Sequence, residues 1–222
     1  MNPSVQPGQR RVGRFHVLTD FHFQQRYSHA ALAELAIRGG ADTIQFRQKR
    51  GFDRHVLLSA RRTAAVCRDM GVPLLVDDRI DLAQAVGAEG VHVGQEDLPV
   101  GIVRRILGSD AIVGATATNV DQAIEAEEQG ASYIGFGPVF RTRSKDNPAS
   151  TKGLYGLREA CDAVRIPVIA ISGITPERVE GVMSAGAWGF AVMTGVSTAD
   201  DPAAAARTYR TALSATLKAV AP

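Results

Sequence analysis

The sequence predicts an α/β fold in which strands and helices alternate eight times and close into a single (β/α)8 barrel, the TIM barrel. The first observation behind this prediction is a recurring phrase that follows an alanine-rich amphipathic stretch and opens an apolar run. Its copies are GADTIQF from Gly40, GAEGVHV from Gly87, GASYIGF from Gly130 and GAWGFAV from Gly186. This order is typical of a helix, the glycine that ends it, and a strand.

The second observation is that four more apolar runs complete the alternation. In chain order, the expected strands lie in FHVLTD from Phe15, GADTIQF, PLLVDD from Pro73, GAEGVHV, AIVGAT from Ala111, GASYIGF, IPVIAIS from Ile166 and GAWGFAV. Strands that alternate with helices form a parallel sheet, and eight units with internal repetition indicate a closed barrel. A doubly wound open sheet is the alternative. It usually needs a glycine-rich turn after the first strand, and LTDFHFQQR contains no glycine.

Composition narrows the class of protein. The formal net charge of +2 argues against a nucleic-acid or membrane footprint. No apolar run approaches the roughly 20 residues that span a bilayer, so a cytoplasmic protein is expected, and the sequence is compatible with a homo-oligomer. Cys67 and Cys161 fall in helix-like segments, which disfavours a disulfide. We predict a flexible tail over residues 1–14 and one barrel domain over 15–222.

Polar residues gather where the predicted strands end. Gln45, Arg47 and Lys49 alternate along the end of the second strand, so their side chains share one face. Burying unpaired charge is costly, which predicts an anion there. Active sites of this fold lie at the C-terminal ends of the strands. The same positions of other strands carry Asp77, Asp78, Asp97, Thr116, Gly173, Met193 and Thr194, and the sixth strand runs into the long loop GPVFRTRSKDNPASTKG.

These residues resemble a known family. The segments IQFRQK, DDRIDLAQAVGAEGVHVGQEDLP, GPVFRTRSK and ISGIT, within about Phe15 to Pro202, are similar to thiamine-phosphate synthases. The resemblance implies a barrel transferase that joins hydroxymethylpyrimidine pyrophosphate to a hydroxyethylthiazole phosphate and releases pyrophosphate. The thiazole nitrogen would attack the pyrimidine methylene carbon. Catalysis would then stabilise a leaving group of about three negative charges, for which fixed cations and a metal are suited.

The resemblance also implies a role for each matching residue. The residues expected at the pyrimidine pyrophosphate are Gln45, Arg47, Lys49, Asp77, Thr116 and Lys145, with Arg47, Lys49 and Lys145 as the catalytic cations. Those expected at the thiazole phosphate are Thr142, Ser144, Gly173, Met193 and Thr194. Asp78 and Asp97 match magnesium ligands, and Mg²⁺ commonly takes one or two carboxylates plus phosphate and water. Asp97 could instead be the N-cap of the helix that follows it.

Departures from the family pattern keep other interpretations open. Asp77 stands where the family usually has Asn, Ser172 replaces a glycine, and Thr116-Ala117-Thr118-Asn119 replaces a Ser-Thr-His-Thr stretch. A thiazole tautomerase of the same fold is one alternative, but it is expected to carry a histidine where this chain has Thr118. A non-catalytic barrel that binds thiamine precursors is the other, and retention of both metal carboxylates argues against it.

Overall fold

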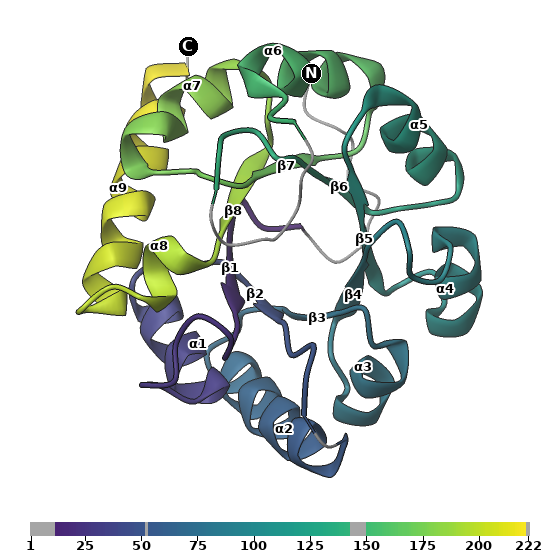
Figure 1. The fold of residues 1–222 in the computed structure, drawn as a ribbon, viewed down its shortest axis with the longest axis vertical. Coiled ribbons are helices and arrows are strands. Elements are labelled where there is room, and N and C mark those ends of the chain that lie inside the picture. The colour runs from purple at the N-terminus through teal and green to yellow at the C-terminus, as the bar shows by residue number, and fades with distance from the viewer. Residues whose placement is uncertain (1–11, 52, 143–149, 221–222) are drawn as a thin grey trace.

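The computed structural model describes residues 12–51, 53–142 and 150–220, and in them eight parallel strands close into a barrel in sequence order, with β8 pairing with β1 (Figure 1). The strands are β1 (Phe15–Thr19), β2 (Thr43–Phe46), β3 (Leu74–Asp77), β4 (Gly90–Val93), β5 (Ile112–Ala117), β6 (Tyr133–Phe136), β7 (Val168–Ile171) and β8 (Gly189–Val192). Seven of them lie within the apolar runs expected to be strands, and β5 extends one residue beyond its run, to Ala117. The predicted (β/α)8 barrel is therefore confirmed.

Helices surround the barrel as an outer ring (Figure 1). They are α1 (His29–Arg38), α2 (Asp53–Asp69), α3 (Ile80–Val86), α4 (Val100–Leu107), α5 (Val120–Glu128), α6 (Gly153–Ala163), α7 (Val179–Ser184), α8 (Thr194–Ser197) and α9 (Pro202–Val220), with a 3-10 turn at Pro176–Arg178. Cys67 and Cys161 lie in α2 and α6 as free thiols. Among the described residues, no helix is both long and apolar enough to span a membrane.

The recurring glycine of the sequence ends a helix each time. Gly40, Gly87, Gly130 and Gly186 all have a positive φ, between 64° and 102°. Residues with a Cβ rarely adopt this left-handed conformation, so glycine is favoured there. The chain can thus turn sharply from each helix into the next strand, as the phrase predicted.

Strand residues alternate between two apolar cores. Outward-facing side chains such as Ile44 and Phe46 pack against the helices in the larger core. A smaller cluster fills the inside of the barrel and includes Leu75, Ile112, Tyr133 and Ile169. This alternation follows from the period of two along a strand. Only a limited set of residues near the strand ends therefore faces the barrel interior above this cluster.

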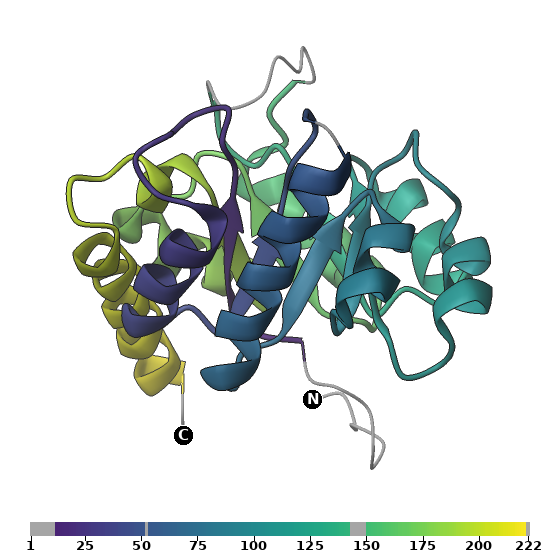
Figure 2. The ribbon, with the colours of Figure 1, turned by 90° about the horizontal axis from the view of Figure 1, so that it is seen from below.

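The two faces of the barrel differ. In side view (Figure 2), the described part of the chain begins at the lower face, where the indole of Trp188 donates to Val12 O at 3.1 Å and Arg14 lies over the ring. Helix α9 ends at this same face (Figure 2). The strands point toward the opposite face, where the loops that follow them meet. Residues 12–14 of the predicted tail thus contact the barrel.

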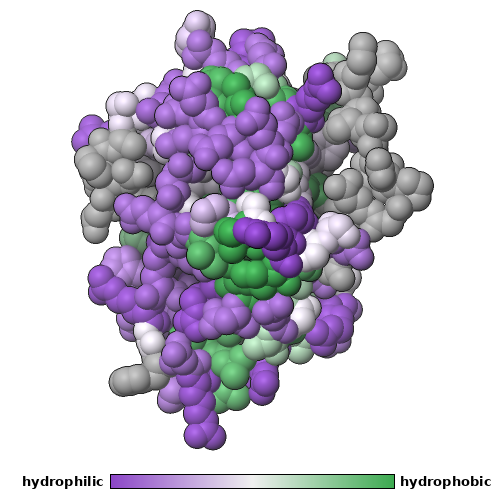
Figure 3. Space-filling view, turned by 90° about the vertical axis from the view of Figure 1, so that its right-hand side faces the viewer, coloured by the Kyte–Doolittle hydropathy of each residue, from purple (hydrophilic) through white to green (hydrophobic). Residues whose placement is uncertain are grey.

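The side of the molecule seen in Figure 3 is mostly hydrophilic. Figure 3 shows the side formed by α3, α4 and α5, which carries a hydrophobic area near its centre. On this side α4 exposes Ile106, and Leu98 just before the helix is also exposed. Isolated exposed apolar residues are common on proteins.

Candidate active site

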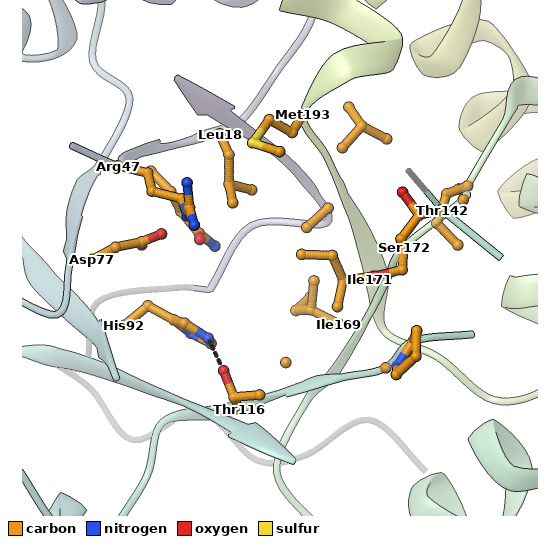
Figure 4. A pocket seen from close by; sticks show the side chains of 18 of the residues that line it. Leu18, Arg47, Asp77, His92, Thr116, Thr142, Ile169, Ile171, Ser172 and Met193 are labelled. Carbon is orange, nitrogen blue, oxygen red and sulfur yellow. Dashed lines mark hydrogen bonds between the residues drawn. The ribbon is translucent and has the colours of Figure 1, made fainter. Parts of the chain in front are cut away.

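A cavity of about 550 Å³ opens at the C-terminal face of the barrel (Figure 4). The residues expected from sequence that line it are Gln45, Arg47, Lys49, Asp77, Asp78, Asp97, Thr116, Thr142, Gly173, Met193 and Thr194. They come from the ends of seven strands, β2 to β8, and the loops that follow them, and the fold brings them together. Ser144 and Lys145 lie outside the described residues. Figure 4 shows Arg47, Asp77 and His92 on one side of the cavity, with Thr142 and Ser172 across from them.

The two cationic residues that directly follow β2, Arg47 and Lys49, each pair with a carboxylate. Arg47 Nη1 donates to the Asp20 carboxylate in an ion pair, and this carboxylate also accepts from the backbone N–H of His22 at 2.6 Å. Both charged side chains of the pair are largely buried. An ion pair shielded from water holds its geometry well. Asp20 had no sequence signal of its own, and its position just after β1 places it beside the end of β2.

Two carboxylates lie next to each other at the ends of β3 and β4. Asp78 has a φ of 65°, which interrupts strand alternation so that both it and Asp77 line the cavity. Burial, together with the nearby Asp78 carboxylate, raises the pKa of Asp97. Lys49 Nζ is 2.8 Å from Asp78 Oδ2. Two crowded carboxylates favour a cation between them.

Asp97 does not cap the helix that follows it. The N-cap of α4 is Pro99, and Asp97 Oδ2 instead accepts from the backbone N–H of Gly94 at 2.6 Å. The carboxylate is therefore fixed by its own loop at the cavity wall, and the N-cap alternative is wrong.

The turn after β7 forms the opposite side of the cavity. Ser172 and Gly173 both have positive φ, of 81° and 65°. A Cβ on Gly173 would lie 2.6 Å from Arg141 O, so a side chain does not fit there. Ser172 bears a conformational cost that a glycine at this position would avoid. The two residues bring backbone close to the cavity, as binding of a phosphate requires.

Replacing Ser172 with glycine should raise the free energy of unfolding by about 1 kcal/mol. The left-handed conformation costs a residue with a Cβ about 1–2 kcal/mol, and glycine avoids this cost. Part of the gain is lost because glycine also increases the conformational entropy of the unfolded state. Denaturant unfolding of both forms measures the difference. Gly101→Ala in α4 is the control for the reverse exchange, the removal of a glycine, because a Cβ there has no neighbour closer than 4.0 Å. A less stable Ser172→Gly variant would contradict the argument.

Several lining residues had no sequence signal of their own. Leu18, Ile169 and Ile171 supply apolar walls, and Tyr133 and His92 lie deeper, where their side chains point inward from β6 and β4. His92 forms hydrogen bonds with Tyr133 OH and Thr116 Oγ1 at 2.9 Å each. Strand alternation, applied backwards from the polar ends, would have identified these inward positions.

Asp77 is the departure with the clearest structural setting. It is buried at the cavity wall, whereas Arg79 turns outward and pairs with Asp53 and Asp81. Arg79 therefore does not offset the Asp77 charge. Next to Asp78, a second carboxylate repels an anionic substrate, and an ionised Asp cannot donate a hydrogen bond as Asn can.

We expect Asp77→Asn to leave kcat/KM for the pyrimidine pyrophosphate equal or higher at neutral pH, because the change removes repulsion and restores a donor. Steady-state kinetics with both substrates measure it, and Asp69→Asn at the end of α2 serves as a matched control. A loss of more than about tenfold, roughly 1.4 kcal/mol, would mean that Asp77 itself binds metal or substrate.

The fold and the cavity together define a class of protein: a (β/α)8 barrel enzyme whose mouth combines fixed cations, paired carboxylates and a glycine-containing turn, as binding of phosphorylated small molecules requires. The family model of thiamine monophosphate synthase matches residues 15–196. The thiamine-phosphate synthase of Salinibacter ruber is 57% identical over 210 residues, covering 95% of this chain and 92% of that protein. That of Chloroflexus aurantiacus is 44% identical over 203 residues, 91% and 94% of the two chains.

A solved structure agrees with these relatives. The thiamine phosphate pyrophosphorylase of Pyrococcus furiosus superposes with a TM-score of 0.84 at 33% identity, covering 92% of this chain and 96% of that one. The chain belongs to the thiamine monophosphate synthase family, and its activity is that of a thiamine-phosphate synthase, a transferase of thiamine biosynthesis. This agreement favours the synthase over the tautomerase and over the non-catalytic barrel.

Proposed function

We propose that the two walls of the cavity bind the two substrates. The side formed by β2 to β5 binds 4-amino-5-hydroxymethyl-2-methylpyrimidine pyrophosphate through Gln45, Arg47, Lys49, Asp77 and Thr116. The side formed by the loops after β6, β7 and β8 binds hydroxyethylthiazole phosphate through Thr142, Gly173, Met193 and Thr194. The observation that carries this proposal is that the charged row and the glycine-containing turn face the same cavity from opposite sides.

In the proposed reaction, the thiazole nitrogen forms a bond to the pyrimidine methylene carbon while the bond from that carbon to the pyrophosphate oxygen breaks. The electron pair leaves with pyrophosphate, and thiamine phosphate remains. Arg47 and Lys49 stabilise the charge that develops on the leaving oxygen, and the family resemblance implies the same role for Lys145 and a phosphate contact for Ser144. Arginine held by Asp20 presents a rigid fork of donors, while lysine acts as a point charge.

The site fits a magnesium ion as part of the proposal. Within the described residues, no group of three or more His, Cys, Asp or Glu side chains is placed to hold a metal, but Mg²⁺ needs only one or two carboxylates when phosphates supply other ligands. Asp78 and Asp97 would hold it. The described charged residues of the cavity are Arg47, Lys49, Arg141, Asp77, Asp78 and Asp97. These charges balance, so a cation is needed to favour a polyanionic substrate.

The test is an assay with both purified substrates and Mg²⁺, with thiamine phosphate and pyrophosphate detected by chromatography. We expect both products in equal amounts, and loss of both when a chelator is in excess. Product formation without either substrate, or none with both, would overturn the proposal. The small-molecule substrates and the biosynthetic family also support a cytoplasmic enzyme, which cell fractionation tests.

A further inference from the structure

A chain of hydrogen bonds runs through the barrel interior from its lower face to the cavity. His16 Nε2 bonds Gly13 O at 3.1 Å, and His16 Nδ1 bonds Gln45 Nε2 at 3.0 Å. Gln45 Nε2 also bonds Tyr133 OH at 3.2 Å. From Tyr133 the chain continues through His92 to Thr116, a step that Figure 4 shows in part. His16, Gln45 and Tyr133 are buried, so water does not compete for these bonds.

Two glycines make room for this chain. A Cβ on Gly114 would lie 2.2 Å from the Tyr133 ring, and one on Gly135 would lie 2.7 Å from His92 Cε1. The tyrosine and the histidine therefore occupy space that glycine leaves open on β5 and β6 respectively. Their positions are set by packing as well as by hydrogen bonds.

At the lower end of this series of hydrogen bonds, which group donates and which accepts is fixed. A backbone carbonyl can only accept, so His16 Nε2 must carry the proton that it shares with Gly13 O. Burial lowers the pKa of His16 to about 3, which keeps the imidazole neutral. Its Nδ1 must then accept, and Gln45 must donate to it through the NH₂ group. With both amide hydrogens directed to His16 and Tyr133, the Gln45 oxygen is the atom left for the cavity that Gln45 lines.

The upper end follows from the lower one. Because Tyr133 OH accepts from Gln45, its own hydrogen goes to His92 Nδ1 at 2.9 Å. His92 Nε2 then carries the proton and donates to Thr116 Oγ1 at 2.9 Å. The hydroxyl hydrogen of Thr116 remains for the cavity that Thr116 lines. A buried Tyr hydroxyl that found no acceptor would carry a desolvation cost, which disfavours the other order.

We propose that His16 is a positioning residue that, through Tyr133 and His92, makes Gln45 a hydrogen-bond acceptor and Thr116 a donor toward the pyrimidine pyrophosphate. The inference rests on the proposed function. It matches the ligand chemistry, because the only donor of the neutral pyrimidine is its exocyclic amino group, while the pyrophosphate only accepts. A remote residue on β1 thereby determines specificity without touching substrate.

Without His16 the chain can run the other way. Gln45 could then turn its oxygen to Tyr133 OH, Tyr133 would accept from His92, and Thr116 would donate to His92. The amide would present NH₂ to the amino group of the substrate, donor against donor, and Thr116 would present lone pairs to an anion. Gln45 and Thr116 would thus exchange their donor and acceptor roles toward the substrate at the same time.

The experiment measures dissociation constants by calorimetry with Mg²⁺ and without the thiazole substrate. The probes are the pyrimidine pyrophosphate, its analogue with hydrogen in place of the amino group, and inorganic pyrophosphate. For the unchanged chain we expect a preference for the amino compound of about tenfold, as one well-placed hydrogen bond provides. His16→Leu should reduce this preference to less than about threefold and also weaken pyrophosphate binding.

Tyr133→Phe tests the two ends of the hydrogen-bond series separately. It removes the hydroxyl that links Gln45 to His92 and leaves the hydrogen bond between His16 and Gln45 in place. It should keep the preference for the amino compound and weaken pyrophosphate binding by about threefold to tenfold. Two matched controls remove equivalent groups elsewhere. Tyr155→Phe removes an exposed hydroxyl on α6, and His55→Leu replaces an exposed histidine on α2. Neither should change any of the three constants.

A general structural effect would weaken all probes equally in both variants, and this result would overturn the inference. An unchanged preference in folded His16→Leu would do the same. If His16→Leu does not fold, Tyr133→Phe decides alone: loss of the amino preference, or unchanged pyrophosphate binding, would contradict the proposed direction. If the unchanged chain binds neither pyrimidine compound, the proposed function fails instead, which is a different outcome.

Discussion

Arg47→Ala is expected to lower kcat/KM for the pyrimidine pyrophosphate by about 10²–10³, the loss typical of removing one donor that stabilises transition-state charge. Arg47 lines the cavity at the end of β2, and Asp20 holds its guanidinium from behind. The substitution removes a fixed, paired donor and leaves the buried Asp20 carboxylate without its partner arginine. An additional negative charge then faces an anionic substrate, so two effects act in the same direction.

Steady-state kinetics at saturating thiazole phosphate measure this effect. Because loss of a buried partner also destabilises a fold, each variant is assayed well below its unfolding midpoint. Arg47→Lys should recover part of the activity through charge alone, without the bidentate geometry. Arg61→Ala, on the exposed surface of α2, is the matched control. A loss below about threefold in Arg47→Ala, less than 1 kcal/mol, would remove the residue from the mechanism.

Asp97→Ala is expected to raise the Mg²⁺ concentration needed for half-maximal activity by about 10²-fold. Magnesium held by only two protein carboxylates has no substitute for either of them, and loss of even an outer-shell partner typically costs 10–100-fold. The Asp97 carboxylate is oriented by the Gly94 N–H and lies beside Asp78. Its removal leaves one ligand, and Lys49 already pairs with that one at 2.8 Å.

Magnesium titrations of the two forms at fixed substrate provide the measurement. Glu96→Ala tests specificity, because Glu96 is the exposed carboxylate next to Asp97 in sequence. It should leave the titration unchanged. Full activity of the unchanged chain in excess chelator would refute the magnesium assignment, as would an identical titration curve for Asp97→Ala.

The sequence carried most of the fold because its signals are local. The glycines at 40, 87, 130 and 186 reported helix ends through the left-handed backbone that each adopts. Gln45, Arg47 and Lys49 were expected on one face of a strand; β2 ends at Phe46, yet all three side chains line the cavity.

The partners of the side chains in ion pairs and hydrogen bonds could not be predicted from the sequence, because they depend on how the strands are staggered around the barrel. Asp20 lies 27 positions from Arg47 and pairs with it through the register of β1 and β2. The bond between Gln45 and Tyr133 crosses the barrel interior from β2 to β6. Arg79 shows that closeness in sequence is also a poor guide to partners. It directly follows the site residue Asp78, yet it pairs with Asp53 and Asp81 outside the cavity.

The separation of the two barrel faces has a practical consequence. Residues 12–14 and the end of α9 lie at the face opposite the cavity (Figure 2). A purification handle, a solid support or a second catalytic domain joined at either end of the described chain would sit below the barrel and leave the mouth clear for substrates. Chimeras that place consecutive biosynthetic steps in one polypeptide therefore have two attachment points on this scaffold that leave substrate entry open.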